Sequence, residues 1–136
     1  MCRIFLARPT DISLQNINLN KLVQYFADLS EIGHLPCGIM GGHKDGFGFA
    51  FVNKSSKEII KSPRPILEDK EVYDQVQNRL NLISGGDIIL GHLRAATHGD
   101  QAIVNTHPFE RENLIMVHNG SIDKRSDEPF PHLKCR

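Results

Sequence analysis

Two apolar segments of the sequence each end abruptly in polar residues, and these polar residues are the first candidates for chemistry. The first segment, residues 87–93, is followed by Arg94, Thr97 and His98. The second segment, residues 114–117, is followed by His118, Asn119 and Gly120. Buried strands that end in clustered polar groups usually end at a binding or catalytic site. We therefore expect these two regions to contribute to one functional site.

The opposite end of the chain supplies a candidate nucleophile, Cys2, directly after the initiator methionine. Removal of Met1 would leave Cys2 with both a thiol and a free α-amine. Because the amine can take the thiol proton as a general base, one residue would supply nucleophile and base together. Taken alone, a cysteine at position 2 is better explained as a small apolar residue at the start of a strand. The prediction of a nucleophile therefore depends on the rest of the site.

The pair Asn119-Gly120 has two interpretations. Acyl transfer needs hydrogen-bond donors aimed at the developing oxyanion, and a side-chain amide and an unobstructed backbone N–H can converge on one oxygen. Asn-Gly is also the strongest short signal for a β-hairpin turn. Spacing alone favours the hairpin.

Arg94 has two interpretations as well. It could hold a substrate carboxylate through two parallel hydrogen bonds, or it could be a buried cation with a structural partner. Strand alternation places it on the same face as His92, and two alanines follow it and leave room beside it. Thr97 and His98 could bind the same ligand or could simply be polar groups at the end of a strand.

Several histidines fall in this part of the chain, namely His92, His98, His107 and His118. Zinc requires three or four ligands in a set geometry, and the sequence has no His-x-x-x-His or Cys-x-x-Cys pair here. A metal site is therefore the weaker interpretation. His107 precedes Pro108, which favours a turn or a packing element.

Composition limits the class of protein. The chain has 136 residues, enough for one domain with a modest core. Its 16 basic and 16 acidic residues balance, which argues against a nucleic-acid or membrane surface as the main partner. No apolar segment is long enough to span a bilayer, and no signal peptide is evident. Three cysteines do not make a disulfide framework, so we expect a cytoplasmic protein.

The elements that must position these residues follow from the hydrophobic pattern. We expect strands at residues 3–7, 46–52, 58–61, 87–94 and 114–118, and helices at residues 18–31 and 67–83. The strands at 87–94 and 114–118 are apolar on both faces, which predicts layers above and below the sheet. Residues 121–136 are polar and without period, which predicts a loose tail.

The strand at 46–52 has an uneven pattern. Its bulky residues, Phe47, Phe49 and Phe51, all fall on one face. Gly46, Gly48 and Ala50 leave the other face nearly bare. Small residues on a strand suggest that another backbone or a ligand approaches closely there.

Together these features resemble the class II glutamine amidotransferases, the N-terminal-nucleophile family with a cysteine nucleophile. The chain begins Met-Cys-Arg, as the stand-alone members of that family do. Four further motifs follow in the family's order: Asp-Gly-Phe-Gly at 45–48, Arg-Ala-Ala-Thr at 94–97, Asn-Thr-His-Pro-Phe at 105–109 and His-Asn-Gly at 118–120. The resemblance covers residues 1–122.

The resemblance implies a role for each candidate residue. Cys2 would attack the side-chain amide of glutamine, release ammonia and form a γ-glutamyl thioester that water hydrolyses. Asn119 and Gly120 would form the oxyanion hole. The reaction would need neither a metal nor an organic cofactor.

The resemblance also implies a pocket and a set of partners. Arg94 would hold the α-carboxylate of glutamine, with Thr97 and His98 lining that pocket. The expected ligand is glutamine or a γ-glutamyl compound, and the expected protein partners are a second copy of the chain or an ammonia-acceptor domain. We expect no nucleic-acid and no membrane partner.

The fold class that the resemblance implies is α+β, the four-layer αββα sandwich of N-terminal-nucleophile hydrolases. Family domains continue well past the His-Asn-Gly motif, so we expect a sandwich that is incomplete at the C-terminus. The expected organisation is a partial glutamine amidotransferase type 2 domain at 1–122 and a polar tail at 123–136. Two alternatives stay open: a hydrolase of γ-glutamyl peptides such as glutathione, and a non-catalytic ligand-binding module of the same fold.

Overall fold

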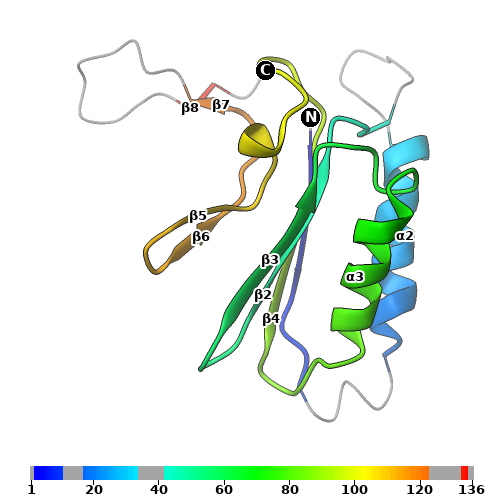
Figure 1. Ribbon diagram of the computed structural model, residues 1–136, viewed down its shortest axis with the longest axis vertical. Helices are drawn as coiled ribbons and strands as arrows, with labels where there is room; N and C mark the ends of the chain where they lie inside the picture. The colour runs from blue at the N-terminus through cyan, green and yellow to red at the C-terminus, as the bar shows by residue number, and fades with distance from the viewer. Residues whose placement is uncertain (1, 11–16, 34–41, 123–132, 135–136) are drawn as a thin grey trace.

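The protein has an α+β fold, in which two helices cover one face of a four-stranded sheet (Figure 1). The computed structural model describes residues 2–10, 17–33, 42–122 and 133–134. The helices are α2 (Leu19–Ile32), α3 (Lys70–Leu80) and the short 3-10 helix η2 (Ile103–Asn105). The strands are β1 (Arg3–Ala7), β2 (Phe47–Val52), β3 (Lys57–Ser62), β4 (Ile88–Leu93), β5 (Phe109–Arg111), β6 (Leu114–Met116), β7 (Ser121–Ile122) and β8 (Leu133–Lys134).

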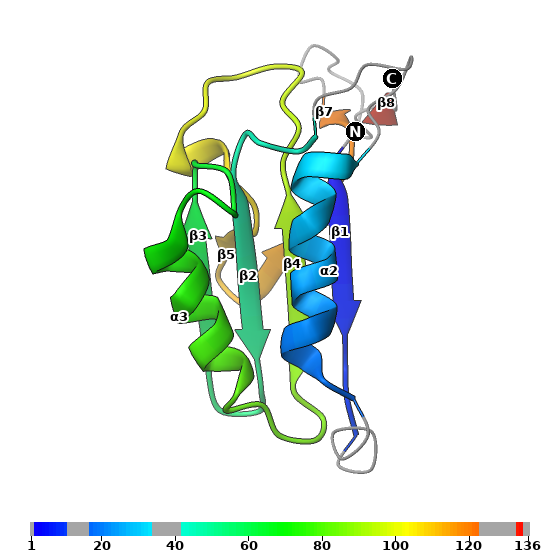
Figure 2. The same cartoon turned by 90° about the vertical axis from the view of Figure 1, so that its right-hand side faces the viewer.

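The main sheet is antiparallel with strand order β1-β4-β2-β3. Figure 2 shows α2 lying across β4 and β1, and α3 lying across β3 and β2. The N-terminal strand β1 is an edge strand that pairs with β4 from Arg3↔Leu93 to Ala7↔Ile89. This pairing places the start of the chain beside the end of β4.

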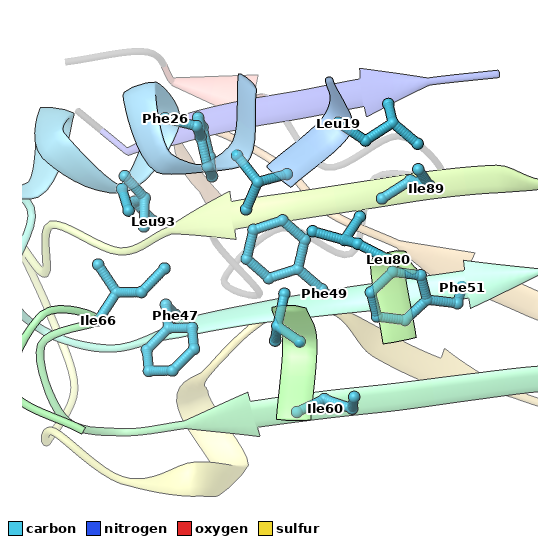
Figure 3. Close-up of a cluster of buried hydrophobic side chains, with 13 residues drawn as sticks. Leu19, Phe26, Phe47, Phe49, Phe51, Ile60, Ile66, Leu80, Ile89 and Leu93 are labelled. Atoms are coloured by element: carbon cyan, nitrogen blue, oxygen red, sulfur yellow. The ribbon is translucent and has the colours of Figure 1, made fainter. Parts of the chain in front are cut away.

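The core lies between the sheet and the two helices, and β2 supplies its centre. Phe47, Phe49 and Phe51 are fully buried and point towards the helices (Figure 3). Phe49 packs with its ring centroid 6.0 Å from that of Phe26 in α2, in an edge-to-face arrangement. Gly91 of β4 makes room for this ring, because an added Cβ at Gly91 would lie 2.7 Å from a carbon of Phe49.

Both predicted helices are present, with one difference in length. The helix predicted at 18–31 is α2, and the Asn18 side chain caps it by accepting a hydrogen bond from the Lys21 N–H at 2.9 Å. The helix predicted at 67–83 extends only over α3, Lys70–Leu80. Its predicted first turn is a separate turn, because the backbone N–H groups of Glu68 and Asp69 both donate to the carbonyl of Pro65.

The bare face of β2 is the site of a close backbone approach, as its small residues predicted. An added Cβ at Gly48 would lie 2.3 Å from the carbonyl oxygen of His107 and 3.0 Å from Cδ of Pro108. The segment around the cis His107-Pro108 bond therefore rests directly on the sheet, opposite the helices. We call this segment, residues 106–108, the docked loop.

The prediction that the strands at 87–94 and 114–118 are buried on both faces was confirmed for the second half of β4 and wrong for β6. His92 and Arg94 are buried on the outer face of the sheet, and Leu93 is buried on the inner face. Ile88 of β4 is exposed on the outer face, and Leu114 and Met116 of β6 are 72% and 45% exposed. Within the described part of the chain β6 pairs with β5 alone, in a two-stranded hairpin set against the face of the sheet away from the helices (Figure 1). An apolar run cannot distinguish a strand covered by two layers from a strand of a projecting hairpin.

The prediction of a tail without regular structure at 121–136 was wrong at four positions. Ser121 and Ile122 form β7, which pairs antiparallel with β8, formed by Leu133 and Lys134. The other residues of the predicted tail, 123–132 and 135–136, lie outside the described residues. Of the helices that the structure describes, none has the length and apolar character needed to cross a membrane.

Candidate active site

Three regions that are far apart in the sequence meet at one end of the main sheet. β1 and β4 pair through Arg3↔Leu93, so one further step of the register sets Cys2 opposite Arg94. Asn119 reaches the same place, because its Nδ2 donates a hydrogen bond to the backbone carbonyl of Cys2 at 3.1 Å. The candidate nucleophile, the segment after β4 and the Asn119-Gly120 pair are thus in contact.

Cys2 carries a free thiol that is half-buried against the segment after β4. Its Sγ lies 3.4 Å from the backbone nitrogen of Ala95 and 3.6 Å from the carbonyl oxygen of the same residue. The sulfur can therefore accept one hydrogen bond and donate another to a single alanine. These contacts fix the position of the thiol without enclosing it.

Asn119 and Gly120 do not form a hairpin turn between flanking strands. β6 before them belongs to the sheet with β5, and β7 after them pairs with β8. The chain instead bends at these two residues, with φ of +136° at Gly120, a conformation that favours glycine. The Asn119 Oδ1 atom is buried and has no hydrogen-bond partner among the described residues. The simple hairpin interpretation of this pair was therefore wrong.

Arg94 is a buried cation that organises the loop following it. Its side chain is only 5% exposed, and its two terminal nitrogens donate to four backbone carbonyls. These acceptors belong to Asp45, His98, Gly99 and Asp100, at 3.0 to 3.3 Å. A guanidinium shared among four carbonyls fixes a loop strongly, because each is a charge-assisted hydrogen bond.

Thr97 and His98 lie on that loop and are exposed to solvent. The Nδ1 atom of His98 lies 3.3 Å from the hydroxyl oxygen of Thr97, so the two side chains face each other. Their side chains are exposed, while Arg94 holds the backbone of the same loop through the carbonyls of His98 and Gly99.

Three histidines pack together behind the Asn119-Gly120 bend. The ring centroid of His107 lies 4.1 Å from that of His92 and 4.6 Å from that of His118. Nε2 of His92 lies 3.3 Å from the carbonyl oxygen of His118, and neither ring nitrogen of His107 has a hydrogen-bond partner among the described residues. We call these three residues the histidine cluster.

Two members of the histidine cluster, His92 and His107, are electrically neutral at ordinary pH. Burial, with smaller contributions from neighbouring cationic groups, lowers the pKa of His92 to about 4 and that of His107 to about 3. Arg94 and Lys61 are near enough to oppose protonation of His107 further. Among the described residues, no three His, Cys, Asp or Glu side chains are arranged to hold a metal ion. The prediction that His107 and Pro108 form a packing element was confirmed.

Lys61 of β3 fastens the docked loop from the other side. Its Nζ donates to the carbonyl of Thr106 at 2.9 Å and to that of Pro108 at 3.3 Å, and it lies 5.7 Å from the ring centroid of Phe109. Partial burial lowers the pKa of this ammonium. Sequence analysis missed Lys61, although the neighbouring bare position, Gly48, gave a signal that something lies there.

Comparison with known proteins supports the relationship that the motifs indicate. The family model for class II glutamine amidotransferases matches residues 15–134. The chain is 33% identical over 92 residues to "Putative glutamine amidotransferase YafJ" of Escherichia coli (strain K12). The aligned region is 62% of this chain and 33% of that protein. It is 34% identical over 99 residues to a "Putative glutamine amidotransferase" of Haemophilus influenzae. This aligned region is 66% of this chain and 31% of the Haemophilus influenzae protein.

A similarity to a larger enzyme was also found. The glutamine–fructose-6-phosphate aminotransferase (isomerizing) of Buchnera aphidicola subsp. Baizongia pistaciae is 38% identical over 79 residues, which is 58% of this chain and 12% of that enzyme. No solved structure gave a significant match. Because the family model matches most of the sequence, the chain belongs to the class II glutamine amidotransferases. It spans about a third of the length of the Escherichia coli and Haemophilus influenzae relatives.

Proposed function

We propose that this chain carries the glutamine-hydrolysing site of an amidotransferase, with Cys2 as the nucleophile. The observation that carries the proposal is the contact of Cys2 with two other regions of the chain at once. Its Sγ meets the backbone of Ala95 at 3.4 Å, and its carbonyl accepts a hydrogen bond from Asn119 at 3.1 Å. Membership of the class II family supports glutamine as the substrate.

The first step is attack of the Cys2 sulfur on the carbonyl carbon of the glutamine side chain. We propose that Met1 is removed and that the α-amine of Cys2 takes the thiol proton. The C–N bond then breaks, the protonated amine gives its proton to the leaving ammonia, and a γ-glutamyl thioester remains. Water, activated by the same amine, attacks the thioester and releases glutamate and the free thiol.

The oxyanion formed in this attack needs donors, and we propose that Asn119 and Gly120 supply them. The Asn119 side-chain nitrogen carries two N–H groups and donates one to the carbonyl of Cys2. In this proposal its second N–H and the backbone N–H of Gly120 both donate to the oxyanion. Donors held in place before the reaction stabilise the developing charge without the cost of reorganisation.

The substrate carboxylate is proposed to bind at the loop after β4. Thr97 and His98 are exposed there and can contact the ligand directly, while Arg94 holds the loop and places a positive charge beneath it. A direct two-bond clamp by Arg94 requires some of its four carbonyl contacts to open when glutamine binds. Binding both ends of the substrate would hold its reacting carbon over the sulfur.

The larger architecture is part of this proposal. We propose that the main sheet and its two helices form one half of the αββα sandwich of N-terminal-nucleophile hydrolases. Cys2 then lies at the start of β1, where such a sheet would present it to the substrate. The released ammonia would pass to an acceptor domain or a separate acceptor protein.

The test combines intact mass spectrometry with a diazoketone analogue of glutamine that alkylates a nucleophilic cysteine. The expected result is loss of Met1 and a single adduct located on Cys2, together with release of ammonia and glutamate from glutamine. Cys2→Ala should give no adduct and no ammonia. Lys54→Met, a change at an exposed position on the β2–β3 turn, is the matched control that should label like the unchanged protein.

Two results would contradict the proposal. One is retention of Met1 in a folded, unlabelled protein, and the other is equal labelling of Cys2→Ala. Glutathione serves as a comparison substrate, and release of glutamate from it without release of ammonia from glutamine would redirect the proposal to γ-glutamyl peptides.

A further inference from the structure

Two consecutive peptide groups separate Cys2 from Asp45, and each contacts both residues. The first peptide group joins Arg94 to Ala95, and its N–H lies 3.4 Å from the Cys2 sulfur while its carbonyl accepts a hydrogen bond from the Asp45 N–H at 3.1 Å. The second joins Ala95 to Ala96. Its carbonyl lies 3.6 Å from the Cys2 sulfur, and its N–H donates to the Asp45 carboxylate at 2.7 Å.

The geometry of the peptide group links these contacts. In a trans peptide the N–H and the C=O point in opposite directions from one rigid plane. A group that holds one end therefore sets the direction of the other. Asp45 bonds to the Arg94 carbonyl of the first peptide group and to the Ala96 N–H of the second. The opposite ends of the two groups, the Ala95 N–H and the Ala95 carbonyl, face the sulfur.

Asp45 is itself fixed in place by the strands. β2 and β4 pair through Phe47↔Leu93, and the ladder continues past the strand ends because the Arg94 N–H donates to the Gly46 carbonyl at 2.8 Å. Two further steps of this register set Asp45 opposite Ala95. The Arg94 guanidinium also donates to the Asp45 carbonyl at 3.3 Å. The carboxylate is thus presented to the Ala96 N–H from a rigid position.

We infer that Asp45 is a positioning residue for the nucleophile: its carboxylate fixes the Ala95–Ala96 peptide so that the backbone of Ala95 holds the Cys2 sulfur in its reactive orientation. The inference rests on the proposed function, in which Cys2 attacks glutamine. Asp45 contacts neither the sulfur nor the substrate in this scheme. Its effect passes through one peptide group, and the essential property of its side chain is a hydrogen-bond acceptor at the right distance.

The experiment measures the reactivity of Cys2 directly, by the rate of alkylation with iodoacetamide under native conditions and by mass spectrometry of the N-terminal peptide. Asp45→Ala removes the acceptor, and we expect Cys2 to be alkylated about tenfold more slowly or to lose selectivity over other thiols. Asp45→Asn keeps an acceptor oxygen at the same distance, and it should restore the rate to within about threefold of the unchanged protein. Asp74→Ala, on the exposed face of α3, is the matched control.

Steady-state kinetics with glutamine give a second readout. Because Asp45 acts on the nucleophile and not on substrate binding, Asp45→Ala should lower kcat about tenfold and leave KM nearly unchanged. If Asp45→Ala does not fold, Asp45→Glu replaces it. That change keeps the charge and moves the acceptor by one methylene group, so slow alkylation is again expected.

The outcomes separate this inference from the proposed function. Unchanged alkylation and unchanged kcat in a folded Asp45→Ala or Asp45→Glu protein would overturn the inference while leaving glutamine hydrolysis intact. Equal loss in Asp45→Asn and Asp45→Ala would also overturn it, because the acceptor would not be the relevant property. Slow alkylation of Asp45→Ala in a protein that never hydrolyses glutamine would support the positioning role and reject the proposed function.

Discussion

On the helix-covered face of the main sheet, β2 presents Phe47, Phe49 and Phe51 to an apolar core, whereas on the opposite face the same strand presents Gly48 and Ala50. The first face is filled by large side chains from two helices. The second face is covered in part by a backbone segment, the docked loop, which lies too close to the strand for any side chain at Gly48. The alternate residues of β2 therefore pack in two ways: the phenylalanines against side chains of the helices, and the small residues against the backbone of the docked loop.

We propose that the two faces of the sheet have different roles, with stability on the helix side and chemistry on the outer side. The helix side holds the aromatic cluster of the core, with Phe49 between Phe5, Phe26 and Phe51. The outer side and the sheet end next to it hold the histidine cluster, the docked loop and Cys2. Damage to the first face should unfold the protein, and damage to the second should change the site while the fold remains. Substitutions on each face can test this division.

The largest effect is expected from Phe49→Ala on the helix side. Phe49 is fully buried, and deleting a buried aromatic ring leaves a cavity that costs about 3–5 kcal/mol. That is a large part of the total stability of a domain of this size, about 5–15 kcal/mol. Urea denaturation followed by circular dichroism measures the loss. Tyr25→Ala removes an exposed aromatic ring from α2 as the control, and an equal loss in both variants would contradict the assigned core.

A pair of glycine substitutions compares the two faces more closely. Gly91→Ala places a methyl group against the ring of Phe49, and Gly48→Ala places one against the carbonyl of His107. Overpacking costs about 1–3 kcal/mol. In Gly91→Ala we expect this cost in the free energy of unfolding.

In Gly48→Ala we expect the cost to fall on the docked loop, which can move away from the sheet. Hydrogen exchange of residues 106–116 should then rise sharply while the urea midpoint changes less than in Gly91→Ala. If both variants lose global stability equally, the docked loop is part of the core and the division between the faces fails.

Much of the fold could be predicted from the sequence because its signals are local. The alternation in β2 and the apolar spacing in α2 each depend on residues close together in the chain. The strand β6 was predicted, but its burial was mispredicted, because the burial of a short apolar strand depends on what packs against it. Among the described residues no second layer covers the segment Leu114–Met116. The residues of the segment carry no signal of this exposure.

The site was harder to predict, because its contacts are made by backbone groups. Cys2, Arg94 and Asn119 were predicted from residue type and motif order, and the structure brings Cys2 into contact with Asn119 and with Ala95, the residue after Arg94. The contacts of Ala95 with Cys2 could not be predicted, because its N–H and carbonyl are backbone groups with no signature in the sequence. Asp45 was noticed only as part of a motif, because its partner is the N–H of an alanine. The carbonyl contacts of Arg94 were missed for the same reason.

Acid should weaken the outer face through the histidine cluster. The folded-state pKa values of His92 and His107, about 4 and about 3, lie below the ordinary value near 6.5, so between these pH values the unfolded chain binds more protons than the folded one. The contribution of the two neutral histidines to the free energy of unfolding is fully present above pH about 6.5. It is lost as the pH falls towards their folded-state pKa values. We expect the free energy of unfolding to fall between pH 7 and pH 5, and to fall less steeply in His92→Gln. The ring of Phe109 packs against that of His107, with 4.2 Å between the centroids, so Phe109→Leu alters the surroundings of the cluster without removing a proton site. The slope of Phe109→Leu should match that of the unchanged protein. A slope that His92→Gln does not affect would exclude the cluster as the cause.

The smallest effect is expected from Lys61→Met, which keeps the length of the side chain and removes the ammonium that joins β3 to the docked loop. Two hydrogen bonds to backbone carbonyls are lost, those to Thr106 and Pro108, while the methylene packing remains. Because the lysine is partly exposed and its carbonyl partners can turn to water, the net cost should be about 1 kcal/mol. We expect faster hydrogen exchange confined to residues 106–109 and a urea midpoint close to that of the exposed control Lys54→Met. A loss of global stability as large as that of Gly91→Ala would mean that Lys61 stabilises the sheet itself and not only the loop that rests on it.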